Sequence, residues 1–126
     1  MDKAGLVERS QREGLLYILF YDDQCPLSVQ SLSSFEVLQQ TDAVFSKCSH
    51  AINARYSSDL ASQFGIYALP SVVLLQNGKP VLFKDGCDLP KPLYAGPLDD
   101  SILKQITSQM SYILSHLNEH HFVVVD

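Results

Sequence analysis

Cys25 and Ser28 are the residues of this 126-residue chain whose types and spacing best predict chemistry. They belong to the segment Cys25-Pro26-Leu27-Ser28, which follows an apolar run at 15–21. Pro26 is typical of a first helical position, because its fixed φ is already helical and its missing N–H costs nothing. A thiol just before it lies among unpaired backbone N–H groups at the positive end of a helix dipole, which favours the thiolate. We therefore predict that Cys25 is an exposed, reactive thiol.

Neighbouring residues leave the pKa of this thiol open. The carboxylates of Asp22 and Asp23 raise it if they lie close to the sulfur, against the effect of the helix. Ser28 is one helical turn from Cys25, and it either donates a hydrogen bond to a thiolate or faces solvent. The alternative for Cys25 itself is a small buried hydrophobic residue.

The flanking sequence predicts the elements that position Cys25. Residues 15–21 are all apolar and rich in strand formers, which indicates a buried strand. Apolar residues then recur at helical spacing, which predicts a helix over about 26–40 with one face in the core. A shorter amphipathic helix is predicted over 2–12 and ends at Gly14.

The remaining elements are predicted by turn signals and hydrophobic patterns. Asn77-Gly78 is the strongest short hairpin signal in the chain. Pro80 favours an edge position for the returning strand, because proline cannot donate a hydrogen bond to a neighbour. In chain order, the predicted elements after residue 40 are a strand over 44–54, a helix over 58–64, a strand over 66–76, its hairpin partner over 80–84, an irregular loop over 85–98 and a helix over 99–117.

This order predicts an α/β fold in which a mixed sheet of four to five strands carries helices on both faces. One domain is expected over 1–117, followed by a tail over 118–126. The apolar end of this tail is an added strand, a contact with a partner, or a segment that fits only in a longer protein.

Composition excludes several classes of function. The formal net charge is −5, and no cluster of Lys or Arg is present, so nucleic acid is not an expected partner. The longest apolar run has seven residues, and no membrane span is expected. The first fourteen residues lack the apolar centre of a secretory signal. The chain as written is therefore expected in the cytoplasm, or in the secretory lumen if it is a piece of a longer precursor.

The sequence predicts no bound metal. Three cysteines without regular spacing form neither a disulfide framework nor a zinc motif. His116, Glu119 and His120 match the His-x-x-Glu-His pattern of one metallopeptidase group. A third ligand is missing, and histidines near the end of a helix are explained by the helix dipole.

The chain resembles the thioredoxin superfamily over about residues 2–117, because it contains three motifs of that family in the family's order. The Cys-Pro-x-Ser pattern, with Tyr94-x-Gly96 before the last helix, is most similar to the monothiol domains of protein disulfide isomerase-like and adenylylsulfate reductase-like proteins. The three motifs are Phe20-Tyr21-x-x-x-Cys25-Pro26-x-Ser28, Phe64-Gly65-Ile66-x-x-Leu69-Pro70-Ser71 before an apolar strand, and Asn77-Gly78-Lys79 before the returning strand.

The resemblance implies a site in which Cys25, Ser28 and Pro70 carry the chemistry. It implies a cis Leu69–Pro70 peptide bond beside Cys25, and the backbone of Leu69 would then pair with an extended client peptide. An ordinary trans-proline at the start of a strand is the alternative. The peptide-binding residues that the resemblance implies are Gln24, Pro26, Leu69 and Gly86, with Gly96 as the alternative to Gly86.

Two departures from the family pattern alter the expected chemistry. Ser28 stands where relatives carry their second cysteine, and Leu19 stands where many carry a buried acid that moves a proton for that thiol. The two-thiol cycle is therefore lost as a unit. Cys87 is either a remote resolving thiol or an incidental loop cysteine, and Cys48 is expected in the core.

The sequence thus predicts a thiol–disulfide exchange or client-binding domain with one reactive cysteine. It would form mixed disulfides with protein clients that bear a cysteine or a disulfide, and would show at most weak isomerase or oxidoreductase activity. No cofactor is expected, apart from glutathione as an external thiol that completes the exchange. The alternative is a redox-inactive scaffold domain that binds proteins through the same fold.

Overall fold

The computed structural model describes residues 3–64, 66, 69–83, 94–96, 98–108 and 122–124. The elements in chain order are α1 (Lys3–Glu13), β1 (Leu15–Tyr21), α2 (Pro26–Thr41), α3 (Ala43–Lys47), β2 (Ser49–Asn53), α4 (Ser58–Gln63), β3 (Ser71–Gln76), β4 (Lys79–Phe83), β5 (Tyr94–Ala95), α5 (Asp100–Ser108) and β6 (Phe122–Val124).

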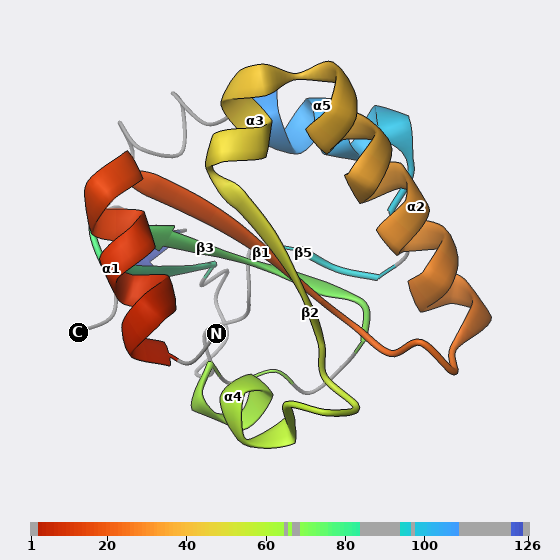
Figure 1. The fold of residues 1–126 in the computed structure, drawn as a ribbon, viewed down its shortest axis with the longest axis horizontal. Helices are drawn as coiled ribbons and strands as arrows, with labels where there is room; N and C mark the ends of the chain where they lie inside the picture. Colours follow the sequence, from red (N-terminus) through yellow and green to blue (C-terminus); the bar gives the residue numbers. More distant parts are fainter. Residues whose placement is uncertain are drawn as a thin grey trace.

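A mixed six-stranded sheet forms the centre of the molecule (Figure 1). Its strand order is β2-β1-β3-β4-β6, and the short β5 pairs with β3. β1 runs parallel to β2 and antiparallel to β3. The predicted α/β class with a mixed sheet is confirmed.

Helices cover both faces of this sheet. One core cluster joins β1, β2 and β3 to Leu6 of α1 and to Leu60 of α4. The other joins the opposite faces of β1 and β3 to Phe35 of α2, Phe45 of α3 and Leu103 of α5. Because both faces of β1 are buried, its sequence is continuously apolar instead of alternating.

The predicted hairpin forms at Asn77 and Gly78, which have φ values of 50° and 89°. Positive φ at both turn residues is the type I′ geometry that matches the twist of the flanking strands. A Cβ atom on Gly78 would lie 2.9 Å from Cγ1 of Val7. Glycine is therefore needed here both for the turn and for the close approach of α1.

The strand predicted over 44–54 is partly wrong. Its first half forms the short helix α3, and β2 begins only at Ser49. Asp42 causes the difference, because its side chain accepts hydrogen bonds from the N–H groups of Val44 and Phe45 at 3.0 and 3.1 Å. This is an N-cap, and it starts a helix where apolar residues alone suggest a strand.

The predicted edge position of the returning strand is also wrong. β4 lies between β3 and β6, and residues 122–124 of the predicted tail form the strand that covers it. Pro80 lies opposite Leu75 of β3, and the described pairs of β4 with β6 begin only at Val81. Proline is therefore tolerated, because none of the described pairs with β6 needs an N–H group at position 80. The tail thus contributes an added strand, which widens the sheet beyond the four to five strands expected.

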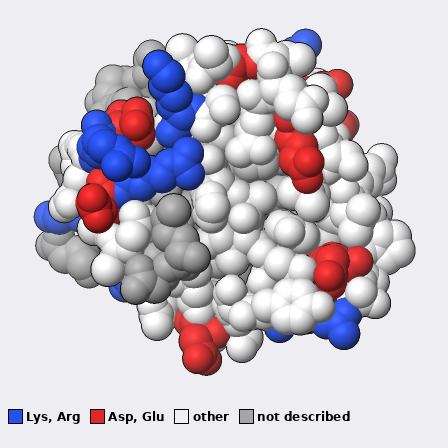
Figure 2. All heavy atoms as spheres, in the orientation of Figure 1, with Lys and Arg blue, Asp and Glu red and all other residues white. Residues whose placement is uncertain are grey.

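None of the helices in the described ranges is both long enough and apolar enough to cross a bilayer. Figure 2 shows that Lys and Arg side chains on this face gather mainly at one corner, with acidic side chains among them, and that much of the remaining face is uncharged.

Candidate thiol site

Cys25 lies at the junction of β1 and α2, as predicted. It is the N-cap residue of α2, with extended backbone angles, and Pro26 follows it at the start of the helix. The N–H of Cys25 donates to the carbonyl of Asp22 at 3.1 Å, and its own carbonyl accepts from the N–H of Val29 at 3.0 Å. The thiol is partly exposed and forms no disulfide. The alternative of a buried hydrophobic cysteine is excluded.

The first turn of α2 lowers the pKa of the Cys25 thiol below its ordinary value. The main causes are the backbone N–H and the side-chain hydroxyl of Ser28, and the N–H of Leu27 adds to them. Limited burial and the charge of Asp22 oppose this effect but do not reverse it. The sign that the sequence left open is therefore towards the thiolate.

Ser28 is fully buried, so its interpretation as a solvent-facing serine is wrong. Its Oγ has no hydrogen-bond partner within the described part of the chain, yet it lowers the pKa of Cys25. Both facts agree if the hydroxyl turns to the sulfur once the sulfur is charged. Ionisation of Cys25 then supplies the acceptor that this buried hydroxyl otherwise lacks.

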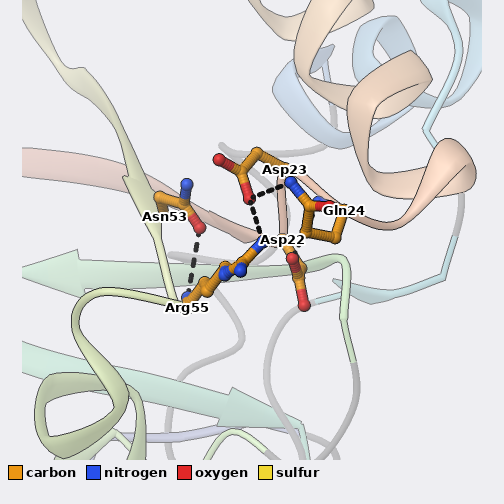
Figure 3. A network of polar contacts seen from close by, with 5 residues as sticks. All are labelled: Asp22, Asp23, Gln24, Asn53 and Arg55. Atoms are coloured by element: carbon orange, nitrogen blue, oxygen red, sulfur yellow. Dashed lines mark hydrogen bonds and ion pairs between the residues drawn. The ribbon is translucent and has the colours of Figure 1, made fainter.

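A network of polar contacts holds the loop just before Cys25 (Figure 3). The side chain of Asp22 accepts from the N–H of Gln24 at 2.9 Å. The carboxylate of Asp23 accepts from the Gln24 amide at 3.4 Å and pairs with Arg55 at 3.6 Å. Arg55 is itself fixed through its N–H, which donates to the side chain of Asn53 at 3.1 Å. The network joins the loop to the corner after β2, although an exposed ion pair adds little to stability.

Pro70 lies at the same end of the sheet as Cys25. The pairing of Phe20 with Ser71 places the residue before Ser71 beside the end of β1, where the loop to Cys25 begins. The Leu69–Pro70 bond is cis, Pro70 is buried and Leu69 is partly exposed.

Gly96 borders Pro70. Its N–H donates to the carbonyl of Pro70 at 2.9 Å, and its φ of 131° is one that side-chain-bearing residues rarely adopt. The contact favours Gly96 over Gly86 as the glycine of this site. Gly86 and Cys87 lie outside the described residues, and their predicted roles stay predictions.

No family model matches the sequence, and no curated protein matches it. Among solved structures, thioredoxin from Fasciola hepatica superposes with a TM-score of 0.63 at 16% identity, covering 83% of this chain and 91% of that one. This chain has a thioredoxin fold.

Other solved structures agree with this fold. Oxidised thioredoxin from Plasmodium falciparum gives a TM-score of 0.60 at 15% identity, with 85% of this chain and 90% of that chain covered. Human ERp44 gives 0.64 at 19% identity over 86% of this chain. The present chain spans only 31% of ERp44. At these identities the likeness concerns the fold alone.

Leu19 occupies the core of this thioredoxin fold. It is fully buried and lies opposite Val72 of β3, among the apolar side chains that include Phe35. A leucine side chain cannot accept or donate a proton, so this position lacks the buried acid that many relatives carry. The groups that lower the pKa of Cys25 are instead those of Ser28 and Leu27 at the start of α2.

Cys48 differs from Cys25 in its surroundings. It is partly buried and packs against the core, as predicted, and its thiol donates to the carbonyl of Val44 at 3.1 Å. Burial is the main cause that raises its pKa. The raised pKa favours the protonated thiol at Cys48, opposite to the effect at Cys25.

Sequence reasoning missed Ser31. This residue is fully buried in α2, and its hydroxyl donates to the carbonyl of Leu27 at 2.8 Å and accepts from the N–H of Leu98 at 2.9 Å. The only signal in the sequence was a serine spaced at one helical turn from Leu27 on a helix with an apolar face.

Proposed function

We propose that this chain is a monothiol exchange domain, in which Cys25 forms mixed disulfides with protein clients. The observation that carries the proposal is the environment of the sulfur: the buried, unpartnered hydroxyl of Ser28 and the backbone N–H groups of α2 favour its thiolate. The thioredoxin fold is consistent with redox chemistry of this class. A thiolate at neutral pH is the form that attacks a disulfide.

The proposed exchange begins when the Cys25 thiolate attacks one sulfur of a client disulfide. A bond forms between the two sulfurs, and the second client sulfur leaves as a thiolate. Ser28 cannot displace the bound client, because a hydroxyl is not a thiol. An external thiol such as glutathione then attacks the client sulfur of the mixed disulfide and releases Cys25 as a thiolate. The domain ends in the reduced state in which it started.

Client binding is proposed at the surface around this sulfur. Gln24 and Pro26 are exposed beside Cys25, and the partly exposed Leu69 precedes Pro70 at the same end of the sheet. Their backbone and side chains would hold the segment of the client that carries its cysteine.

The test uses oxidised glutathione as a defined disulfide and intact-protein mass spectrometry as the readout. With Cys48 and Cys87 replaced by serine, the chain with Cys25 intact should gain one glutathione that dithiothreitol removes. The further variant Cys25→Ser should gain none. A chain that retains Cys25 and gains no glutathione at pH 7 would contradict the exchange function and favour the redox-inactive scaffold.

Client capture is tested separately. Client proteins should co-purify with the intact chain under non-reducing conditions and be released by dithiothreitol, and the Cys25→Ser variant should lose them. Equal recovery by both chains would exclude covalent capture.

A further inference from the structure

The thiol site has two sides, here called its walls: the first turn of α2 next to Cys25, and Pro70 at the same end of the sheet. Ser31 connects these two walls. Its hydroxyl donates to the carbonyl of Leu27, the residue whose N–H is among the groups that lower the pKa of Cys25. The oxygen of the same hydroxyl accepts from the N–H of Leu98, 67 residues along the chain. One buried hydroxyl thus links the first turn of α2 to the segment that precedes α5.

The segment reached by Ser31 also holds Pro70. Gly96, two residues before Leu98, donates its N–H to the carbonyl of Pro70 at 2.9 Å. Three hydrogen bonds thus form the connection: Ser31 to Leu27 at 2.8 Å, Leu98 to Ser31 at 2.9 Å, and Gly96 to Pro70 at 2.9 Å. They place the helix turn that surrounds the sulfur and the proline wall in one arrangement.

Burial makes this connection hard to replace by water. Ser31 is fully buried and Leu98 is 3% exposed, so a lost partner leaves a backbone N–H without a hydrogen bond in the core. Water could not readily enter to replace the hydroxyl.

We propose that Ser31 is a positioning residue of the thiol site, which holds the first turn of α2 against the Pro70 wall and so sets the reactivity of Cys25. Ser31 acts through Leu27 and Leu98 and does not take part in the exchange. The inference rests on the proposed function for its biological consequence, but the reactivity of the thiol is measurable without a client.

Ser10 provides a matched control within the same chain. It is also fully buried in a helix, and its hydroxyl donates to the carbonyl of Val7 at 2.8 Å. It lies in α1 and belongs to neither wall of the thiol site. The variants Ser31→Ala and Ser10→Ala therefore each remove one buried helical hydroxyl, and only the first removes the connection.

The experiment measures the alkylation rate of Cys25 by iodoacetamide against pH, with Cys48 and Cys87 replaced by serine. Ser31→Ala should move the midpoint of the profile to higher pH and slow the reaction at pH 7 about threefold. Above both midpoints the rates should converge, because the thiolate itself is unchanged. Ser10→Ala should keep the profile of the parent chain even where its urea midpoint falls as much as that of Ser31→Ala.

The outcomes separate this inference from the proposed function. If Ser31→Ala and Ser10→Ala give the same profile while the parent chain exchanges with glutathione disulfide, the role of Ser31 is overturned and the proposed function stands. If the parent chain does not exchange but Ser31→Ala still moves the midpoint, the role of Ser31 stands and the proposed function fails.

A second measurement needs no variant of Ser31. In the parent chain, the amide resonances of Leu98 and Gly96 should titrate with the midpoint of Cys25, and Cys25→Ser should abolish the change. Resonances of Leu98 that are unaffected by the ionisation of Cys25 would overturn the connection, even if Ser31→Ala does not fold.

Discussion

At the scale of single residues, the reactivity of Cys25 depends on groups within one helical turn of it. The sequence was sufficient to place Cys25 at the start of a helix, because Pro26 and the apolar run before it are local signals. It could not decide whether Ser28 is buried, since this depends on what packs over α2. The contacts of Asp23 with Arg55 and of Ser31 with Leu98 were missed for the same reason, because each joins residues distant in the chain.

The first prediction concerns Ser28→Ala. Loss of the hydroxyl removes one of the two main causes that lower the pKa of Cys25, so that pKa should rise and alkylation at pH 7 should slow. The free energy of unfolding, measured with urea at a pH where the thiol is protonated, should change by less than about 0.5 kcal/mol, because the hydroxyl lost was buried without a partner.

The lowered pKa of Cys25 determines how the stability of the folded chain changes with pH. The folded chain favours the thiolate, so the thiol contributes stability above the pKa of the unfolded chain and loses it as the pH falls through the folded pKa. The exposed Ser33 on the same helix is the control, and Ser33→Ala should leave the alkylation profile unchanged. An unchanged midpoint in Ser28→Ala would show that the backbone N–H groups alone set the pKa.

At the scale of elements, helices and strands with strong local sequence signals were predicted well, and the short helix α3, which depends on its N-cap, was not. β1 was predicted with its observed bounds, and α2 and the returning strand β4 were predicted to within one residue, because apolar periodicity and Asn77-Gly78 act locally. The strand predicted over 66–76 begins only at Ser71, after the cis Leu69–Pro70 bond. The short helix α3 was missed, since five residues carry too little periodicity to outweigh their apolar content. Asp42 was the available signal, because aspartate is one of the favoured N-cap residues.

The second prediction tests the cap of α3. Asp42→Ala removes hydrogen bonds to the N–H groups of Val44 and Phe45, and should lower the free energy of unfolding by about 1 kcal/mol in urea titrations. Asp42→Asn keeps an oxygen that can accept these bonds and should be close to the parent chain. If Asp42→Ala proves as stable as Asp42→Asn, the side chain does not determine where α3 begins.

At the scale of the whole molecule, the strand pairing shows which features of the fold could be predicted from the sequence and which could not. The class and the mixed pairing follow from the order of the elements, because a helical crossover favours parallel strands and a two-residue turn requires antiparallel ones. The pairing of β4 with β6 has no local signal, since the two strands are far apart in the chain. The prediction of an edge strand failed for this reason.

The third prediction tests β6. Deletion of residues 122–126 removes three cross-strand pairs with β4 and should lower the free energy of unfolding by about 1–2 kcal/mol. The amide of Leu82 should then exchange faster with solvent, as measured by hydrogen exchange, because the two-residue turn directs the N–H groups of Lys79 and Val81 towards β3 and that of Leu82 towards β6. Deletion of 125–126 alone is the control. Unchanged protection of the Leu82 amide in the longer deletion would show that β6 does not hold β4 in solution.

The direction of β6 has a practical consequence. Phe122 lies opposite Phe83 and Val124 opposite Val81, so the chain runs along β6 towards the end of the sheet that carries the Asn77-Gly78 turn. Cys25 follows the opposite end of β1. A bead or sensor chip attached beyond β6 would therefore present the sulfur outward, away from the support, and this is the orientation in which immobilised protein should be used to search for clients.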